Sequence, residues 1–188
     1  MQSDSNVKKI SNHISKKVAD KLGSMFKKDR KDFESKWNDI EVFIQYGMLT
    51  DDKFGERAEK FTLLKTTEEE FFTFEEYKEK VKGAQTDKEN KLVYLYTHNA
   101  EEHHSLIETA KFKGYNVLLL DGPLSSHYIQ KLEEKQGVSL ARLDADTIDK
   151  LINKEEAQPS KLSKKEEDKV KPVFESNVSK DKFTVQFE

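Results

Sequence analysis

The sequence predicts an α/β protein in which a helical connector precedes a small three-layer α/β/α sandwich with a short, mainly parallel sheet of three strands. Two runs of β-branched, aromatic and aliphatic residues, 92–97 and 115–120, flank a segment with helical spacing that Gly114 ends. Because residues 117–120 read VLLL, we expect the second strand to be buried on both faces, as parallel strands covered by helices are. The crossover between the two strands should be right-handed.

Length and composition limit the size of the core. A chain of 188 residues is enough for one or two small domains. Its hydrophobic content of 35% is low and its charged content of 37% is high, against typical values of about 45–50% and about 25%. We therefore expect a small core and large solvated helical faces.

Charge and cysteine content exclude several functions. The net charge of −3 gives no overall attraction to nucleic acid or membranes. The sequence has no cysteine, which excludes disulfides, thiolate zinc sites and a cysteine nucleophile, and a cytoplasmic protein fits this composition. No apolar run reaches the length of about 18 residues that suggests a membrane span, so no membrane partner is expected.

The first half should contain three amphipathic helices and a short fourth one. The first covers 6–28, the second runs from Phe33 until Gly47 stops it, and a weaker third covers 54–64. Thr73 should cap the fourth helix through a capping box with Glu76. The apolar positions of the first helix follow steps of three and four: Val7, Ile10, Ile14, Val18, Leu22, Met25 and Phe26.

The second half alternates strand and helix. After the unit that ends near residue 120, we expect a helix over 123–136, a strand over 138–143 and a final short helix over 148–152. This order is typical of a three-layer α/β/α sandwich. The sandwich is small, so it should share part of its burial with the helices before it.

The last part of the chain changes character. Lys, Glu, Asp and Ser dominate residues 153–171, and residues 183–187 then alternate as an amphipathic strand does. We expect this end to be a cut rather than a natural terminus. The predicted organisation is a helical connector at 1–87, an α/β/α subdomain at 88–153, and a charged linker with the truncated start of a further domain at 154–188.

No motif in the sequence predicts catalysis or metal binding. The turn after the first strand, residues 97–100, has no glycine to admit a phosphate, which disfavours a dinucleotide site. The histidines and glutamates of 98–104 lack the i, i+4 histidine spacing of a helical zinc site, so a solvated helix start is the better interpretation. Ser125 and Ser126 lie beside His127 without a nucleophile elbow.

The lysines of the first helix allow two interpretations. A solvated polar face is the default, and a surface that contacts an acidic partner is the alternative. Nucleic-acid binding is disfavoured because no aromatic residues interleave with these lysines. The lysines concerned are Lys8, Lys9, Lys16, Lys17, Lys21, Lys27 and Lys28.

Five stretches together resemble the heat-shock-protein-90 chaperone family, in its bacterial form. They are MQSDSNVKKI (1–10), FIQYG (43–47), TFEEY (73–77), LVYLYT (92–97) and VLLL (117–120). The resemblance covers essentially the whole chain and follows the element order of the family. It implies the later part of the middle domain, followed by the start of the dimerising C-terminal domain.

The resemblance implies an ATP-driven molecular clamp that remodels folding clients. ATP and magnesium would belong to the full-length protein, and this segment by itself would hold no cofactor and would not be an enzyme. A family loop of the form Ser-Arg-x-x-Leu-Gln reaches the nucleotide. Its glutamine matches Gln2, which would contact the ATP phosphates, while its arginine would lie upstream of Met1.

The resemblance also implies partners. They are unfolded or partly folded clients, the protein's own N-terminal ATPase domain, and the C-terminal dimerisation domain of a full-length homodimer. For the helix after Pro123, we expect His127 and whichever of Tyr128 or Ile129 is exposed to contact clients; burial of both apolar side chains is the alternative. A free-standing α/β binding or scaffold protein that shares only this fold is the alternative function.

Overall fold

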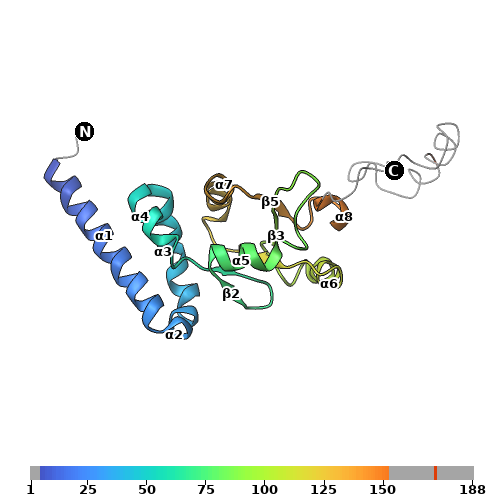
Figure 1. Ribbon diagram of the computed structural model, residues 1–188, viewed down its shortest axis with the longest axis horizontal. Coiled ribbons are helices and arrows are strands. Elements are labelled where there is room, and N and C mark those ends of the chain that lie inside the picture. Colours follow the sequence, from blue (N-terminus) through green and yellow to red (C-terminus); the bar gives the residue numbers. More distant parts are fainter. Residues whose placement is uncertain (1–4, 153–171, 173–188) are drawn as a thin grey trace. The chain divides into compact units, whose positions relative to one another are not determined.

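The computed structural model describes residues 5–152 and Pro172. The described residues up to Ile152 belong to one compact unit. The predicted charged linker, apart from Pro172, and the predicted strand at 183–187 lie outside the described residues. Figure 1 shows the order of the helices and strands.

Four helices form the first part of the predicted connector, and from here on the name connector refers to these helices and the segment directly after them. They are α1 (Ser5–Lys28), α2 (Arg30–Ser35), α3 (Trp37–Thr50) and α4 (Asp52–Ala58). The break before Arg30 occurs where it was predicted, because Asp29 adopts an extended conformation and its side chain accepts from the Asp32 N–H. None of the described helices combines the length and apolar character needed to span a bilayer.

The predicted second helix is divided in two. The Ser35 hydroxyl donates to the Asp32 carbonyl, and the Lys36 N–H donates to the Phe33 carbonyl at 3.2 Å. These short-range hydrogen bonds replace the regular i to i−4 pattern, so α2 ends at Ser35 and α3 begins at Trp37.

The prediction that Gly47 stops this helix is wrong. α3 continues through Gly47 to Thr50, and Asp51 then caps α4 by accepting from the Phe54 N–H. A Cβ at position 47 would lie 2.6 Å from Cε1 of Phe54. Glycine is therefore present because the Phe54 ring packs against the α3 backbone, and not because the helix ends.

A hairpin replaces the end of the predicted third helix. β1 (Leu64–Lys65) and β2 (Phe71–Phe72) pair antiparallel, and Glu69 adopts a positive φ of 59° in the turn between them. α5 (Phe74–Val81) follows, and the predicted capping box between Thr73 and Glu76 is confirmed.

The α/β subdomain has the predicted elements. They are β3 (Val93–Thr97), α6 (His104–Phe112), β4 (Val117–Leu119), α7 (Ser125–Gln136), β5 (Ser139–Arg142) and α8 (Ile148–Leu151). The strand order is β4-β3-β5, and both pairs are parallel. An antiparallel bridge between Thr66 and Leu118 attaches the hairpin to β4. A mainly parallel sheet is therefore confirmed.

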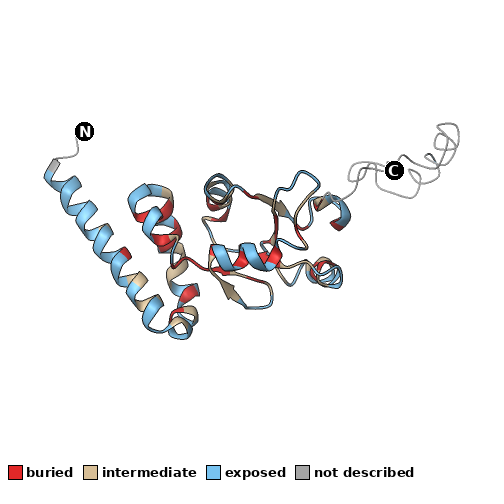
Figure 2. Ribbon diagram, in the orientation of Figure 1, coloured by how far each residue is buried: buried red, intermediate tan, exposed pale blue. Residues whose placement is uncertain are grey.

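Two cores lie on opposite faces of this sheet. On one face, Leu95 and Val117 pack with Ile107 of α6 and Ile148 of α8. On the other, the sheet packs with α5, α7 and the connector in a single continuous core. β3 is buried along most of its length, as expected for a strand that is covered on both faces. Figure 2 colours the described residues by burial. This arrangement confirms the three-layer sandwich.

The second of these cores joins the two halves of the described chain. Phe33, Trp37 and Phe61 of the connector belong to the same cluster as Tyr94 and Leu118 of the sheet. The subdomain therefore shares its burial with the connector, as its small size suggested. The other core lies entirely after residue 87, within the α/β subdomain.

Candidate functional site

The predicted client-contact residues lie in the first turns of α7, and the structure separates them. Tyr128 is 1% exposed, whereas His127 is exposed and Ile129 is half-buried against the core. Tyr128 is therefore unavailable at the surface, because its ring faces the connector. Client contact remains a prediction for His127 and for the exposed part of Ile129.

The burial of Tyr128 has a polar consequence. Its hydroxyl is buried without a hydrogen-bond partner among the described residues. Burial raises the pKa of Tyr128, and the negative charges of Glu41 and Glu59 add to that effect. This side chain is a neutral core residue that fixes α7 against α3.

Gln2, the predicted phosphate-contacting residue, lies outside the described residues.

The structure reveals a large apolar surface that the helical spacing did not distinguish from core. Leu22 and Phe26, in the last turns of α1, pack against the core, but Ile10 and Ile14 are 61% and 56% exposed. Most of α1 is pale blue in Figure 2. The apolar stripe of α1 is therefore longer than the connector can cover.

Helix α3 supplies the other wall of this surface. Phe43 is 73% exposed and Tyr46 is 60% exposed. Between α1, α3 and the start of α4 lies a groove of about 910 Å³, which we call the α1–α3 groove. Apolar residues at 43, 44 and 46 cover more of the helix circumference than one stripe does, and this breadth is the signal that sequence reasoning missed. Its apolar lining includes Ile14, Val18, Leu22, Ile40, Phe43, Ile44 and Phe54.

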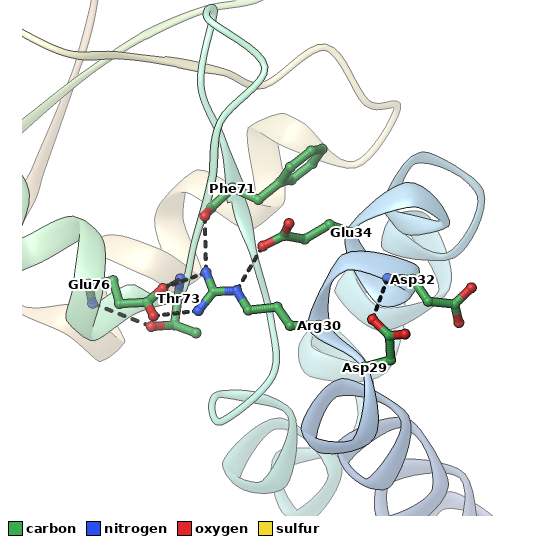
Figure 3. Close-up of polar contacts among 7 residues, drawn as sticks. All are labelled: Asp29, Arg30, Asp32, Glu34, Phe71, Thr73 and Glu76. Carbon is green, nitrogen blue, oxygen red and sulfur yellow. Dashed lines mark hydrogen bonds and ion pairs between the residues drawn. The ribbon is translucent and has the colours of Figure 1, made fainter.

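A polar junction ties the connector to the hairpin and to α5. Both Nη atoms of Arg30 donate to the Glu76 carboxylate, Nε donates to Glu34 Oε1 at 2.7 Å, and Nη2 also donates to the Phe71 carbonyl at 3.1 Å. Figure 3 shows the guanidinium between these partners. Glu76 meanwhile accepts from the Thr73 N–H at 2.8 Å. One arginine therefore links α2, β2 and the cap of α5.

The junction sets the charge state of Glu76. The hydrogen bonds from Arg30 lower the pKa of Glu76 to about 2, from an ordinary value of 4.5. A carboxylate whose pKa falls on folding adds stability above its unfolded pKa and loses that contribution as the pH falls through the folded pKa. Because the Glu76 side chain is 43% exposed, solvent reduces the size of this contribution.

The substitution Glu76→Gln should therefore lower stability at pH 7, and the deficit should shrink as the pH falls from about 4.5 toward about 2. Glutamine keeps an oxygen that can accept from the Thr73 N–H, so the change removes charge and spares the cap. Urea unfolding at pH 7 and pH 3 measures the difference. Glu75→Gln, one position earlier in α5, is the control, and an equal deficit there would contradict the assignment to Arg30.

A second polar cluster lies where α3 meets the loop before α7. Burial and the nearby negative charge of Asp121 raise the pKa of Glu41. Oε1 of Gln45 is buried without a hydrogen-bond partner among the described residues. Oxygens of Glu41 and Gln45 both lie within 3.9 Å of the point where a Cβ of Gly122 would be. This cluster lies beside Gly122, in the loop before α7.

Two of the histidines after β3, His98 and His103, have protein partners. Nδ1 of His103 lies 2.7 Å from Oγ1 of Thr97, and Nδ1 of His98 contacts the Leu120 carbonyl. Oδ1 of Asn99 accepts from the N–H groups of Glu101 and Glu102. These contacts organise the start of α6. In the part of the chain that the structure describes, no three His, Asp or Glu side chains are arranged to hold a metal ion.

Comparison with known proteins assigns the family. A model described as Hsp90 protein matches residues 1–186. The chain belongs to the Hsp90 family. It is 49% identical over 181 residues to chaperone protein HtpG of Bacteroides thetaiotaomicron and 47% identical over 192 residues to chaperone protein HtpG of Porphyromonas gingivalis. These matches cover 96% and 100% of this chain.

The Hsp90 relatives are much longer than this chain. It spans 27% of the Bacteroides protein and 28% of the Porphyromonas protein. The fold is also similar to a solved structure, the middle domain of a Plasmodium falciparum heat shock protein, with a TM-score of 0.57. That similarity covers 77% of this chain and 61% of the other at 15% identity, so it supports the fold alone.

Proposed function

We propose that this chain is the middle-domain segment of an ATP-dependent molecular chaperone, and that it binds and helps to remodel folding client proteins. The observation that carries the proposal is the identity of 47–49% to HtpG chaperones over nearly the whole chain. By itself the segment is not catalytic. ATP and magnesium act in the longer protein, and Gln2 contributes a phosphate contact there beside an arginine from upstream.

The exposed apolar surface supports an interaction role. The α1–α3 groove has a volume of about 910 Å³, and several apolar side chains along it are exposed. An ordinary protein surface exposes single, scattered hydrophobic residues instead. In the proposed full-length homodimer, folding clients and the neighbouring ATPase and C-terminal domains bind to surfaces of this kind. A cytoplasmic location fits this role.

Client contact on α7 involves His127 and Ile129. Both lie in the first turns of a helix that Tyr128 fixes to the connector, so they are presented by a rigid element. Their neighbour Ser126 is also exposed. A small apolar area beside polar groups suits weak and adaptable binding of many sequences.

The test is an NMR titration of the 188-residue chain with an unfolded client, such as reduced and carboxymethylated α-lactalbumin. Resonances of residues 126–130 should shift, and His127→Ser should weaken binding. His104→Ser, at an exposed position at the start of α6, is the matched control. Unmoved α7 resonances, an equal loss in the control, or ATP turnover by the chain alone would count against the proposal.

A further inference from the structure

A second groove lies between α1 and α4, on a different side of α1 from most of the α1–α3 groove. Its volume is about 360 Å³, and we call it the α1–α4 groove. The two helices pack against each other, and Figure 1 shows them next to one another. Its floor is apolar, because the small residues Ala19 and Gly23 let α1 approach the buried ring of Phe61. Its rim consists of Asp20, Ser24, Lys27, Arg57 and Lys60.

The rim carries positive charge that no acidic side chain neutralises. Arg57 pairs with Asp20 at 3.2 Å, which leaves Lys27 and Lys60. Both lysines are exposed, and none of the ion pairs among the described residues involves either of them. α1 and α4 both end near this rim, but each helix end carries only about half a negative charge, so the ends offset part of the charge of the two lysines. The rim is therefore open to an anionic group.

α1 extends this positive surface beyond the groove. Four of its residues follow one another at steps of four, three and four and therefore lie on one face of the helix: Lys16, Asp20, Gly23 and Lys27. Lys16 is exposed and is also absent from the ion pairs of the described residues. At a rise of about 1.5 Å per residue, Lys16 lies about 16 Å from Lys27 along the helix. With seven lysines and one aspartate, α1 is strongly positive in a chain whose net charge is −3.

The aromatic residues at the groove favour an acidic protein segment over nucleic acid. Single-stranded nucleic acid binds where its bases can stack on aromatic rings. Phe61 is 2% exposed, and Phe26 is half-buried with the guanidinium carbon of Arg30 5.5 Å from its ring centroid. These rings are poor platforms for stacking, whereas carboxylates need only the charged rim.

We propose that the α1–α4 groove binds an acidic segment of a partner protein. Charge complementarity argues for this occupant, because its carboxylates would meet Lys27 and Lys60 at the rim and Lys16 further along α1. An extended segment of about five residues covers the distance from Lys16 to Lys27. The inference goes beyond the proposed function and does not depend on client contact by α7.

The test uses fluorescence anisotropy with the 188-residue chain and two short labelled peptides. In one peptide glutamate alternates with serine and valine, and in the other glutamine replaces every glutamate. The glutamate peptide should bind at low salt and weaken as salt rises, and the glutamine peptide should not bind. The largest NMR shifts should fall on residues 16–27 and 57–61. Equal binding of the two peptides would overturn the inference.

A double variant locates the site. K27Q/K60Q should raise the Kd of the glutamate peptide about fivefold, because two exposed charge pairs are lost. The control K78Q/K88Q removes the same charge at exposed positions outside the groove and should change Kd less than about twofold. An unchanged Kd in K27Q/K60Q, or an equal change in both variants, would contradict the assignment to this groove.

Two further measurements decide between occupants. A single-stranded RNA with the same net charge as the glutamate peptide should bind more weakly than the peptide. Tighter binding of the RNA that is lost in K27Q/K60Q would make nucleic acid the occupant and would overturn the proposal. A lower sedimenting mass of K27Q/K60Q compared with the unaltered chain would make a second copy the occupant, with the same consequence. An unchanged mass and weaker binding of the RNA support an acidic partner.

Discussion

Replacing Phe33 with alanine should destabilise the fold by about 3–5 kcal/mol, as truncation of a fully buried aromatic side chain does. Phe33 is 0% exposed. Its ring centroid lies 5.6 Å from that of Phe26, 6.1 Å from that of Trp37 and 6.3 Å from that of Phe61. Because these rings come from α1, α3 and the segment after α4, the cavity would open where the connector helices meet. Urea unfolding of the chain measures the loss.

Phe112→Ala is the matched control for this prediction. Phe112 ends α6 and is 93% exposed, so the same truncation removes almost no buried area. The control should change the free energy of unfolding by less than about 0.5 kcal/mol. Similar losses for the two variants, or a loss below about 1 kcal/mol for Phe33→Ala, would show that the connector core is not centred on Phe33.

Gly47→Ala should destabilise the fold by about 1–3 kcal/mol, the range expected for overpacking a core. The added Cβ would lie 2.6 Å from Cε1 and 2.7 Å from Cδ1 of Phe54, whose side chain is 6% exposed. Alanine favours a helix more than glycine does, but this gain is smaller than the cost of displacing a buried ring. Thermal or urea unfolding gives the sign directly.

Two further variants test the cause of the Gly47 effect. Gly83→Ala is the control, since no atom lies within 4 Å of its added Cβ, and it should be neutral or stabilising by up to about 1 kcal/mol. Replacing the ring through Phe54→Leu should reduce the penalty of Gly47→Ala. The double variant should then lose less free energy of unfolding than the two single variants lose together. Full additivity would contradict a contact between residues 47 and 54.

Local signals in the sequence were sufficient for most elements. The capping box of Thr73 and Glu76 begins α5 as predicted, and Gly114 and Gly137, with φ of 79° and 64°, follow the ends of α6 and α7. The hairpin was not predicted, because strands of two residues are too short to show alternation. Leu64 instead completed an apparent helical spacing, although it pairs with Phe72 across a turn.

Sequence pattern also limited what could be predicted of the candidate sites. Helical spacing marks an apolar stripe but does not say whether a partner covers it, so Ile10 and Phe43 could not be separated from Leu22. On α7, the spacing left open whether Tyr128 or Ile129 is exposed. The approach of α3 decides that question, because it covers Tyr128 and leaves Ile129 at the edge of the core.

The order of elements in the α/β sandwich and the Hsp90 family could be predicted from the sequence, because both depend on patterns that neighbouring residues or long matched stretches carry. The contacts between distant segments became known from the folded structure. Arg30 meets Glu76 across 46 positions and Phe71 across 41, and nothing in the local sequence of either partner requires the other. The α1–α3 groove exists for the same reason, since packing brings together its walls from α1, α3 and the start of α4.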